Sequence, residues 1–147
     1  MKALSNLAQS VRASTTLAID TEGIDVIGFS VGQPDFPTPE HIKQAGIRAI
    51  QENLTKYTPT PGTPAVRKAV ADRLDADWGL DYTPEEIVVS GGGKPILYVA
   101  LKTLIDPGDE VILPAPYWVS YYELIKMVGG VPVVVTTTEE NGFNLTP

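Results

Sequence analysis

Apolar residues recur at helical spacing in several stretches of the chain, and β-branched runs alternate with the last of them. The spacing predicts helices over residues 4–11, 39–53, 64–78, 95–105 and 119–127. The β-branched runs predict strands over 87–90, 110–113 and 131–135, with a further extended segment over 24–29. From residue 87 onward strands and helices alternate, an order that favours a parallel sheet with helices on its faces. The pattern therefore predicts an α/β fold.

Capping residues sharpen the limits of these helices. Thr38 and Thr63 are expected to cap the helices that begin near Pro39 and Pro64, and Gly79 is expected to end the second of these. A brief capping turn is expected over 83–86, just before the first predicted strand. The apolar positions that should face inward are Ile42, Ala45, Ala49 and Ile50 in the first helix and Val66, Val70 and Leu74 in the second.

Three glycines, Gly91 to Gly93, follow the first predicted strand, and Pro95 is expected at the first position of the next helix. A glycine-rich turn at a helix N-terminus lets backbone N–H groups approach an anion, and Lys94 adds a full positive charge. We interpret this stretch as a phosphate cradle. The alternative is a plain strand-to-helix turn that the glycines merely close. Neither the Walker pattern nor the dinucleotide-binding pattern of glycines is present.

Proline-rich loops occur over 32–39, 56–62 and 114–118, and such rigid loops often carry sites. Ligands of parallel sheets bind beyond the carboxyl ends of the strands. The glycine turn and the 114–118 loop both leave strand ends on that side. We therefore expect Lys94 and Trp118 to line one pocket.

Composition narrows the function. The chain has 147 residues, 43% hydrophobic, with a net charge of −7, which indicates one globular domain and argues against nucleic acid or an anionic membrane as partner. The absence of cysteine excludes disulfides, thiolate catalysis and cysteine-based zinc sites, and it fits a cytoplasmic location. His41 is the only histidine, so neither a serine–histidine triad nor a multi-histidine metal site is expected. No apolar run approaches a membrane span of ~18 residues, and the first residues lack the apolar core of a signal peptide.

Five motifs then occur in one order along most of the chain: Gly32-Gln33-Pro34-Asp35-Phe36-Pro37-Thr38-Pro39, Lys56-Tyr57-Thr58-Pro59 with Gly62, Gly92-Gly93-Lys94, Asp106-Pro107-Gly108-Asp109-Glu110-Val111, and Pro116-Tyr117-Trp118-Val119-Ser120-Tyr121. Together they resemble the N-terminal part of the class I aminotransferases, which are fold-type I pyridoxal-phosphate enzymes, and most of all the bacterial aspartate aminotransferase group. The resemblance implies an α/β fold, the three-layer α-β-α large domain of that family, incomplete here and spanning 39–147. Residues 1–38 would form an N-terminal arm and a substrate loop.

The resemblance also implies a cofactor site for pyridoxal 5′-phosphate. The backbone of Gly92 and Gly93 would hold the phosphate, with Lys94 adding charge beside it. Trp118 would stack on the pyridine ring and contribute to substrate binding, although a core tryptophan is the alternative. By the same resemblance, the Ala115–Pro116 peptide is expected to be cis.

The resemblance to the family also implies roles toward the substrate and a partner subunit. Gly32 would offer its N–H to the α-carboxylate of the substrate. Tyr57 would donate its hydroxyl to the cofactor phosphate of a neighbouring subunit, with an ordinary packed tyrosine as the alternative. The expected partners are an amino acid, a 2-oxo acid and a second copy of the chain in a homodimer.

The chain departs from the family pattern, and these departures leave two functional hypotheses open. None of its lysines matches the motif of the lysine that holds the cofactor as a Schiff base, so no catalytic residue is assigned. The segment between Asp20 and Ile24 is also shorter than in the family. One hypothesis is a part of a longer aminotransferase that moves an amino group from an L-amino acid, expected to be aspartate, to a 2-oxo acid. The other is an inactive fragment or interaction module that keeps the phosphate cradle and the dimer surface. In this chain alone, the three predicted strands would be left with unpaired edges, so we expect that polypeptide outside this sequence supplies the rest of the sheet, that the strands re-pair, or that the fold is marginal.

Overall fold

The computed structural model describes residues 5–11 and 32–146. These residues fall into two compact units, one of them Gly32–Gly91 and the other containing Gly92–Pro147, and each is described by itself. The predicted extended segment over 24–29 and the short stretch between Asp20 and Ile24 lie outside the described residues. The expected division into 1–38 and 39–147 stays a prediction.

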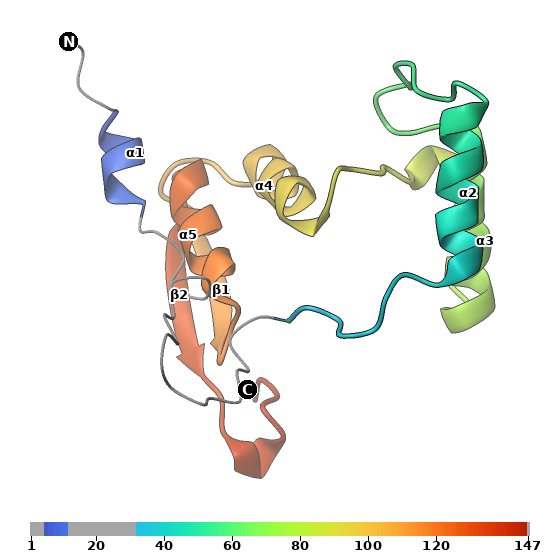
Figure 1. Cartoon of the computed structure of the whole chain (residues 1–147). Coiled ribbons are helices and arrows are strands. Elements are labelled where there is room, and N and C mark those ends of the chain that lie inside the picture. Colours follow the sequence, from blue (N-terminus) through green and yellow to red (C-terminus); the bar gives the residue numbers. More distant parts are fainter. Residues whose placement is uncertain (1–4, 12–31, 147) are drawn as a thin grey trace, which may run out of the picture. The chain divides into compact units, whose positions relative to one another are not determined.

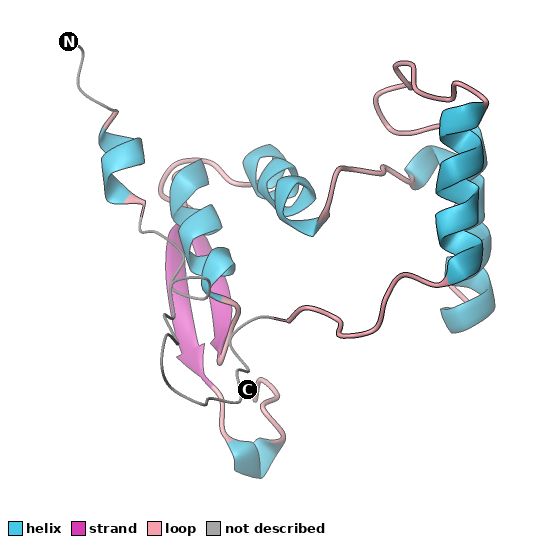
Figure 2. Ribbon diagram, viewed as in Figure 1, coloured by secondary structure: helices cyan, strands magenta, loops and turns pink. Residues whose placement is uncertain are grey.

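A parallel β-α-β motif forms the centre of the unit that contains Gly92–Pro147 (Figures 1 and 2). Strand β1 (Glu110–Ala115) pairs with β2 (Val131–Thr136), and helix α5 (Val119–Val128) connects them and packs against both. The register runs without interruption from Glu110 opposite Val131 to Ala115 opposite Thr136. This arrangement confirms the α/β class and the last two predicted strands.

The core of this motif lies between α5 and the strands. Leu113 of β1 is buried together with three apolar residues of α5, which are Leu124, Ile125 and Val128. Helix α5 ends where Gly129 adopts a left-handed conformation with φ 97°. The chain then enters β2 through the buried Gly130. Helix α4 (Gly93–Leu104) packs against α5.

The predicted strand over 87–90 is not formed, which corrects the expectation of three strands. In the described residues the sheet has two strands, β1 and β2. Ile87 is buried and Val89 donates its N–H to the carbonyl of Pro61, so the segment is tied down by a loop instead of a strand. A β-branched run has the propensity for a strand, but it becomes one only when a partner backbone runs alongside it.

The unit Gly32–Gly91 contains helices α2 (Glu40–Gln51) and α3 (Pro64–Trp78) and the 3₁₀ turn η2 (Pro84–Glu86). The limits of α3 follow the predicted capping. The Thr63 hydroxyl accepts the N–H of Val66 at 3.3 Å, Pro64 opens the helix, and Gly79 closes it with φ 65°. Arg67 of α3 holds η2 by donating its Nε–H to the carbonyl of Pro84 at 2.7 Å.

Two expected helix starts differ in the structure. Helix α2 has Pro39 as its N-cap in place of Thr38, and the Pro39 carbonyl accepts the N–H of Ile42. Helix α4 begins at Gly93, so Pro95 is its third residue instead of its first. Proline is tolerated at both places because the first N–H groups of a helix have no intrahelical partner.

The expected inward face of α2 is wrong, and that of α3 is partly formed. Helix α2 has no buried residue, and Ile42 is exposed. In α3 Ala71 is buried, Val70 and Leu74 are half-buried, and Val66 is exposed. Helical periodicity identifies an apolar stripe, but a stripe becomes a core only where another element packs on it.

The described residues also include a short helix α1 (Asn6–Ser10) and a 3₁₀ turn η3 (Glu139–Asn141). Among the helices that the structure describes, none combines the length and apolarity needed to cross a bilayer.

Candidate cofactor site

The N-terminus of α4 is built from the glycine turn. Gly92 is its N-cap with φ 132° and ψ 168°, a region of backbone space that is essentially restricted to glycine, and no side chain caps the helix. The first N–H groups of an α-helix have no partner within the helix. Those of Gly93 and Lys94 are therefore available to an anion, whose charge the helix dipole also favours.

The space around this turn is open. A Cβ placed on Gly91 or Gly93 would meet no atom within 4 Å, and one on Gly92 would meet only the Pro95 Cδ at 3.9 Å. A group as large as a phosphate can therefore approach the backbone. The donors and the open approach fit the phosphate group that the sequence predicts at this turn.

Lys94 and Trp118 lie together, as expected from the two loops that carry them. The ammonium of Lys94 lies over the indole ring of Trp118, 4.9 Å from the ring centroid. Trp118 immediately precedes α5, and the residue is 42% exposed. A cation and a partly open aromatic face therefore flank the uncapped helix start, an arrangement suited to an anionic ligand that carries a planar ring.

The backbone at the end of β1 brings Trp118 to this place. The Ala115–Pro116 peptide is cis, as expected. Thr137, just after β2, donates both its N–H and its hydroxyl to the Ala115 carbonyl, at 3.0 and 2.6 Å. The loop that leads to Trp118 is thus tied to the end of the neighbouring strand.

Sequence reasoning missed Tyr121 as a neighbour of the site. Its ring meets the Trp118 ring edge-to-face, with centroids 5.5 Å apart and an interplanar angle of 88°. The signal was the spacing of three residues at the start of a predicted helix, which places two side chains on the same face.

The remaining predicted site residues, Gly32 and Tyr57, belong to the unit Gly32–Gly91. The side chain of Tyr57 is fully exposed. A Cβ on Gly32 would meet no atom within 4 Å, so its backbone is open to approach. Their roles toward substrate and a second subunit stay predictions.

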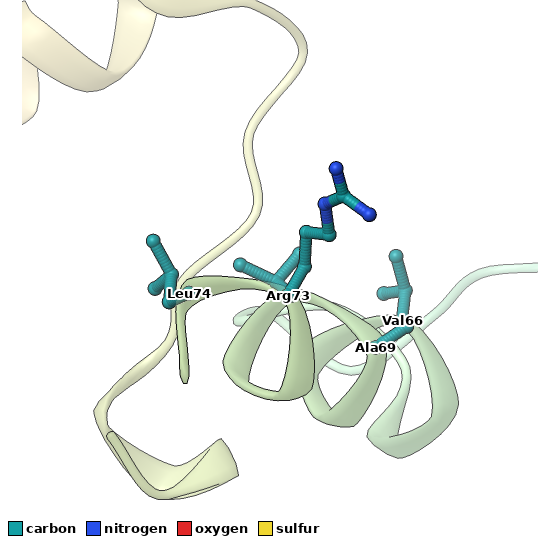
Figure 3. A pocket seen from close by; sticks show the side chains of 5 residues that line it. Val66, Ala69, Arg73 and Leu74 are labelled. Atoms are coloured by element: carbon teal, nitrogen blue, oxygen red, sulfur yellow. The ribbon is translucent and has the colours of Figure 1, made fainter. Parts of the chain in front are cut away.

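A shallow pocket of about 290 Å³ lies on α3 and contains none of the predicted site residues (Figure 3). Its lining is Val66, Ala69, Val70, Arg73 and Leu74. The one charged group of the lining, Arg73, is paired with Asp77 at 2.6 Å. An apolar hollow whose charged residue is already paired offers no group for acid–base or nucleophilic chemistry, so we place the candidate site at α4 and Trp118.

Comparison with known proteins shows which family the chain belongs to. The family profile described as aminotransferase class I and II matches residues 24–147. The aspartate aminotransferase of Geobacillus stearothermophilus is 47% identical over 98% of this chain and 38% of its own length. The probable aspartate/prephenate aminotransferase of Thermus aquaticus is 45% identical over 97% of this chain and 39% of its own length.

Solved structures agree with the sequence relatives. A structure of aspartate aminotransferase from Thermus thermophilus with maleate has a TM-score of 0.92 and 42% identity, covering 99% of this chain and 40% of that one. The aspartate aminotransferase of Rhizobium meliloti has a TM-score of 0.89 and 39% identity, covering 99% of this chain and 38% of that one.

The chain thus spans about two fifths of the length of the relatives it matches. Within that span, the family match includes the glycine turn, Lys94 and Trp118. The chain belongs to the class I and II aminotransferases, and its homologues among the aspartate aminotransferases are pyridoxal-phosphate-dependent enzymes.

Proposed function

We propose that this chain supplies the phosphate cradle and the ring-stacking tryptophan of an aminotransferase that moves an amino group from an L-amino acid to a 2-oxo acid. The observation that carries the proposal is the open, uncapped start of α4, with Lys94 and Trp118 in contact beside it. A plain turn that only leads into the helix explains the glycines, but it gives no reason for a cation and an exposed indole to meet there.

Each residue of the site has a physical task. The N–H groups of Gly93 and Lys94 donate to phosphate oxygens, and the Lys94 ammonium offsets their charge in a chain of net charge −7. Trp118 offers an aromatic face against which a pyridine ring stacks. When bound, pyridoxal phosphate supplies an electron sink for the substrate, while the protein holds and orients it.

The substrate is proposed to be a dicarboxylic amino acid, with aspartate as the amino donor. Relatives over nearly all of this chain are named aspartate aminotransferases, and one solved relative is described with maleate, a dicarboxylate. Gly32 is proposed to donate its N–H to the α-carboxylate, since the open space around its backbone admits such a group.

A second copy of the chain is proposed as partner in a homodimer. Tyr57 is fully exposed, so its hydroxyl is free to reach a phosphate held by another subunit. A cytoplasmic location is proposed with it, in keeping with a chain that lacks cysteine.

None of the lysines of this sequence matches the family's cofactor-anchoring motif, so these 147 residues are proposed to bind the cofactor without turning it over. Without the anchoring lysine, no positioned base moves the proton from the substrate Cα. An interaction module that keeps the cradle is the alternative function. Both hypotheses expect no turnover by the chain alone, so an amino-donor assay with added pyridoxal phosphate tests the proposed inactivity. Turnover by a mass-verified 147-residue chain would contradict it.

Binding tests the cradle directly. Calorimetric titration with pyridoxal phosphate should give saturable binding that inorganic phosphate competes away. Trp118→Ala should weaken binding about two- to tenfold, the range that a lost aromatic stack accounts for. The matched control is Trp78→Ala, because Trp78 is an exposed tryptophan at the end of α3. Equal loss in both variants, or no binding at all, would contradict the proposal.

A further inference from the structure

The contact between Lys94 and Trp118 joins two elements of the site. Lys94 is the second residue of α4 and Trp118 is the N-cap of α5, and their ammonium-to-centroid distance of 4.9 Å is within the reach of about 6 Å for a cation–π contact. A change in the position of either side chain is therefore transmitted to the other.

The indole of Trp118 is only partly buried. Trp118 is 42% exposed as a residue, whereas the neighbouring core residues Leu124 and Ile125 are 6% and 3% exposed. Within the described residues, the ring is contacted by the Lys94 ammonium and, edge-to-face, by Tyr121. Removing one of two such contacts should loosen the ring measurably.

The ammonium of Lys94 has no competing ion pair among the described residues. Lys126 provides a contrast on α5, because it lies 5.5 Å from the Tyr122 ring centroid and also 3.6 Å from a Glu123 oxygen. The ammonium of Lys94 can therefore interact either with the indole or with an anion that binds at the N-terminus of α4.

We propose that Lys94 is a positioning residue that holds the indole of Trp118 and couples its orientation to the occupancy of the α4 N-terminus. The coupling rests on the proposed function. An anion on the N–H groups of Gly93 and Lys94 draws the ammonium toward itself, because the same helical turn carries both. The cation–π contact weakens, and the indole becomes free to stack on the ring that accompanies the phosphate.

The positioning half is tested without any ligand. In a Trp78→Phe background the remaining emission comes from Trp118, since the chain has two tryptophans. Lys94→Met should increase the rotational freedom of the indole and its quenching by acrylamide, and Lys94→Arg should restore both values. Lys126→Met is the matched control, and circular dichroism confirms folding of each variant. If Lys94→Met and Lys126→Met behave alike, Lys94 does not position the ring.

The coupling half is tested with inorganic phosphate in the same background. The emission of Trp118 should change saturably with phosphate, and in Lys94→Met the change should disappear while phosphate binds about two- to fivefold more weakly. Phosphate binding that leaves Trp118 emission unchanged overturns the coupling and leaves the proposed function intact. If neither phosphate nor pyridoxal phosphate binds, both the coupling and the proposed function are overturned. The comparison of Lys94→Met with Lys126→Met without ligand then still decides whether Lys94 positions the ring.

Discussion

Gly92 shows how much of the site depends on one backbone conformation. Its φ of 132° with ψ of 168° sets the direction in which α4 begins, and therefore the direction in which the N–H groups of Gly93 and Lys94 point. A side chain at this residue would force the turn into another conformation, and the donors would no longer converge.

We expect Gly92→Ala to destabilise the turn by about 1–3 kcal/mol, the usual cost of a non-glycine residue in such a region, and to weaken phosphate binding. Gly91→Ala is the matched control. Gly91 has no positive φ, and a Cβ added to it would meet no atom within 4 Å, so the effect of this change should stay within about 0.5 kcal/mol. Thermal unfolding and phosphate titration of the two variants provide the comparison. Equal effects would show that Gly92 is not special.

The sequence predicted this turn but could not show which of its glycines has the unusual conformation. Three consecutive glycines beside a lysine indicate a close backbone approach. They are the same residue type, and only Gly92 of the three has a positive φ. The Lys94–Trp118 pair was expected from the shared end of the strands. Tyr121 was missed because its role arises from a side-chain contact that loop patterns do not reveal.

At the scale of elements, the turn η2 is stabilised by a charge on Glu86. Its carboxylate accepts the Thr83 N–H at 2.8 Å and the Thr83 hydroxyl at 3.1 Å. These bonds, the backbone bond first, lower the pKa of Glu86 from its ordinary value. The stabilisation is therefore present above the unfolded pKa of about 4.3 and is lost as pH falls through the lower folded pKa.

We expect the Thr83 amide resonance to titrate with a midpoint below that ordinary glutamate value, since protonation of Glu86 weakens the acceptor. In Glu86→Gln the titration should vanish. Two-dimensional NMR spectra recorded between neutral and acid pH give the titration midpoint of the Thr83 amide resonance. A midpoint at or above the ordinary glutamate value would contradict the bonding seen here.

The passage from α5 into β2 depends on Gly130. A Cβ there would lie 3.0 Å from the Ile105 Cγ2 and 3.1 Å from the Ile125 Cγ2, in the buried part of the motif. We expect Gly130→Ala to lower the free energy of unfolding by about 1–3 kcal/mol through overpacking. Gly46→Ala, in open space within α2, should instead stabilise by about 0.4–1 kcal/mol. Chemical denaturation followed by circular dichroism tests whether the two changes have opposite signs.

Local chemistry explains which elements the sequence could predict. The limits of α3 could be predicted from Thr63, Pro64 and Gly79, because capping involves only neighbours in the chain. The 87–90 segment could not be decided in this way, since a strand needs a partner and the backbone N–H of Val89 bonds to Pro61 in a loop.

At the scale of the whole molecule, exposed large apolar side chains outnumber buried ones among the described residues. Among the described residues six hydrophobic side chains are buried, while 25 large ones are exposed. Exposed apolar surface of this extent favours association. The α/β class and its parallel pairing were predictable from the alternation of elements, but the sparse burial was not, because periodicity reports which residues are apolar and not what covers them.

We expect the purified chain to associate, with the homodimer as the first species above the monomer. Sedimentation velocity over a range of concentrations should show the sedimentation coefficient rising with concentration. The driving force is burial of exposed side chains such as Ile112, which is 65% exposed on β1. A strict monomer at the highest attainable concentration would contradict the expectation.

The uninterrupted register of β1 and β2 has a kinetic consequence. Each paired residue is separated from its partner by 21 positions, as in Glu110 opposite Val131 (131 − 110 = 21). The strand entrances are also linked, since Val131 donates its N–H to the Asp109 carbonyl at 2.8 Å and Gly108 donates to Gly129 at 2.9 Å. Closing a loop of this length costs less chain entropy than closing the longer loops of more distant contacts, because the cost grows with loop length. The β1–α5–β2 motif can therefore form early, as soon as this stretch leaves the ribosome, and it can present Trp118 before slower, more distant contacts are made.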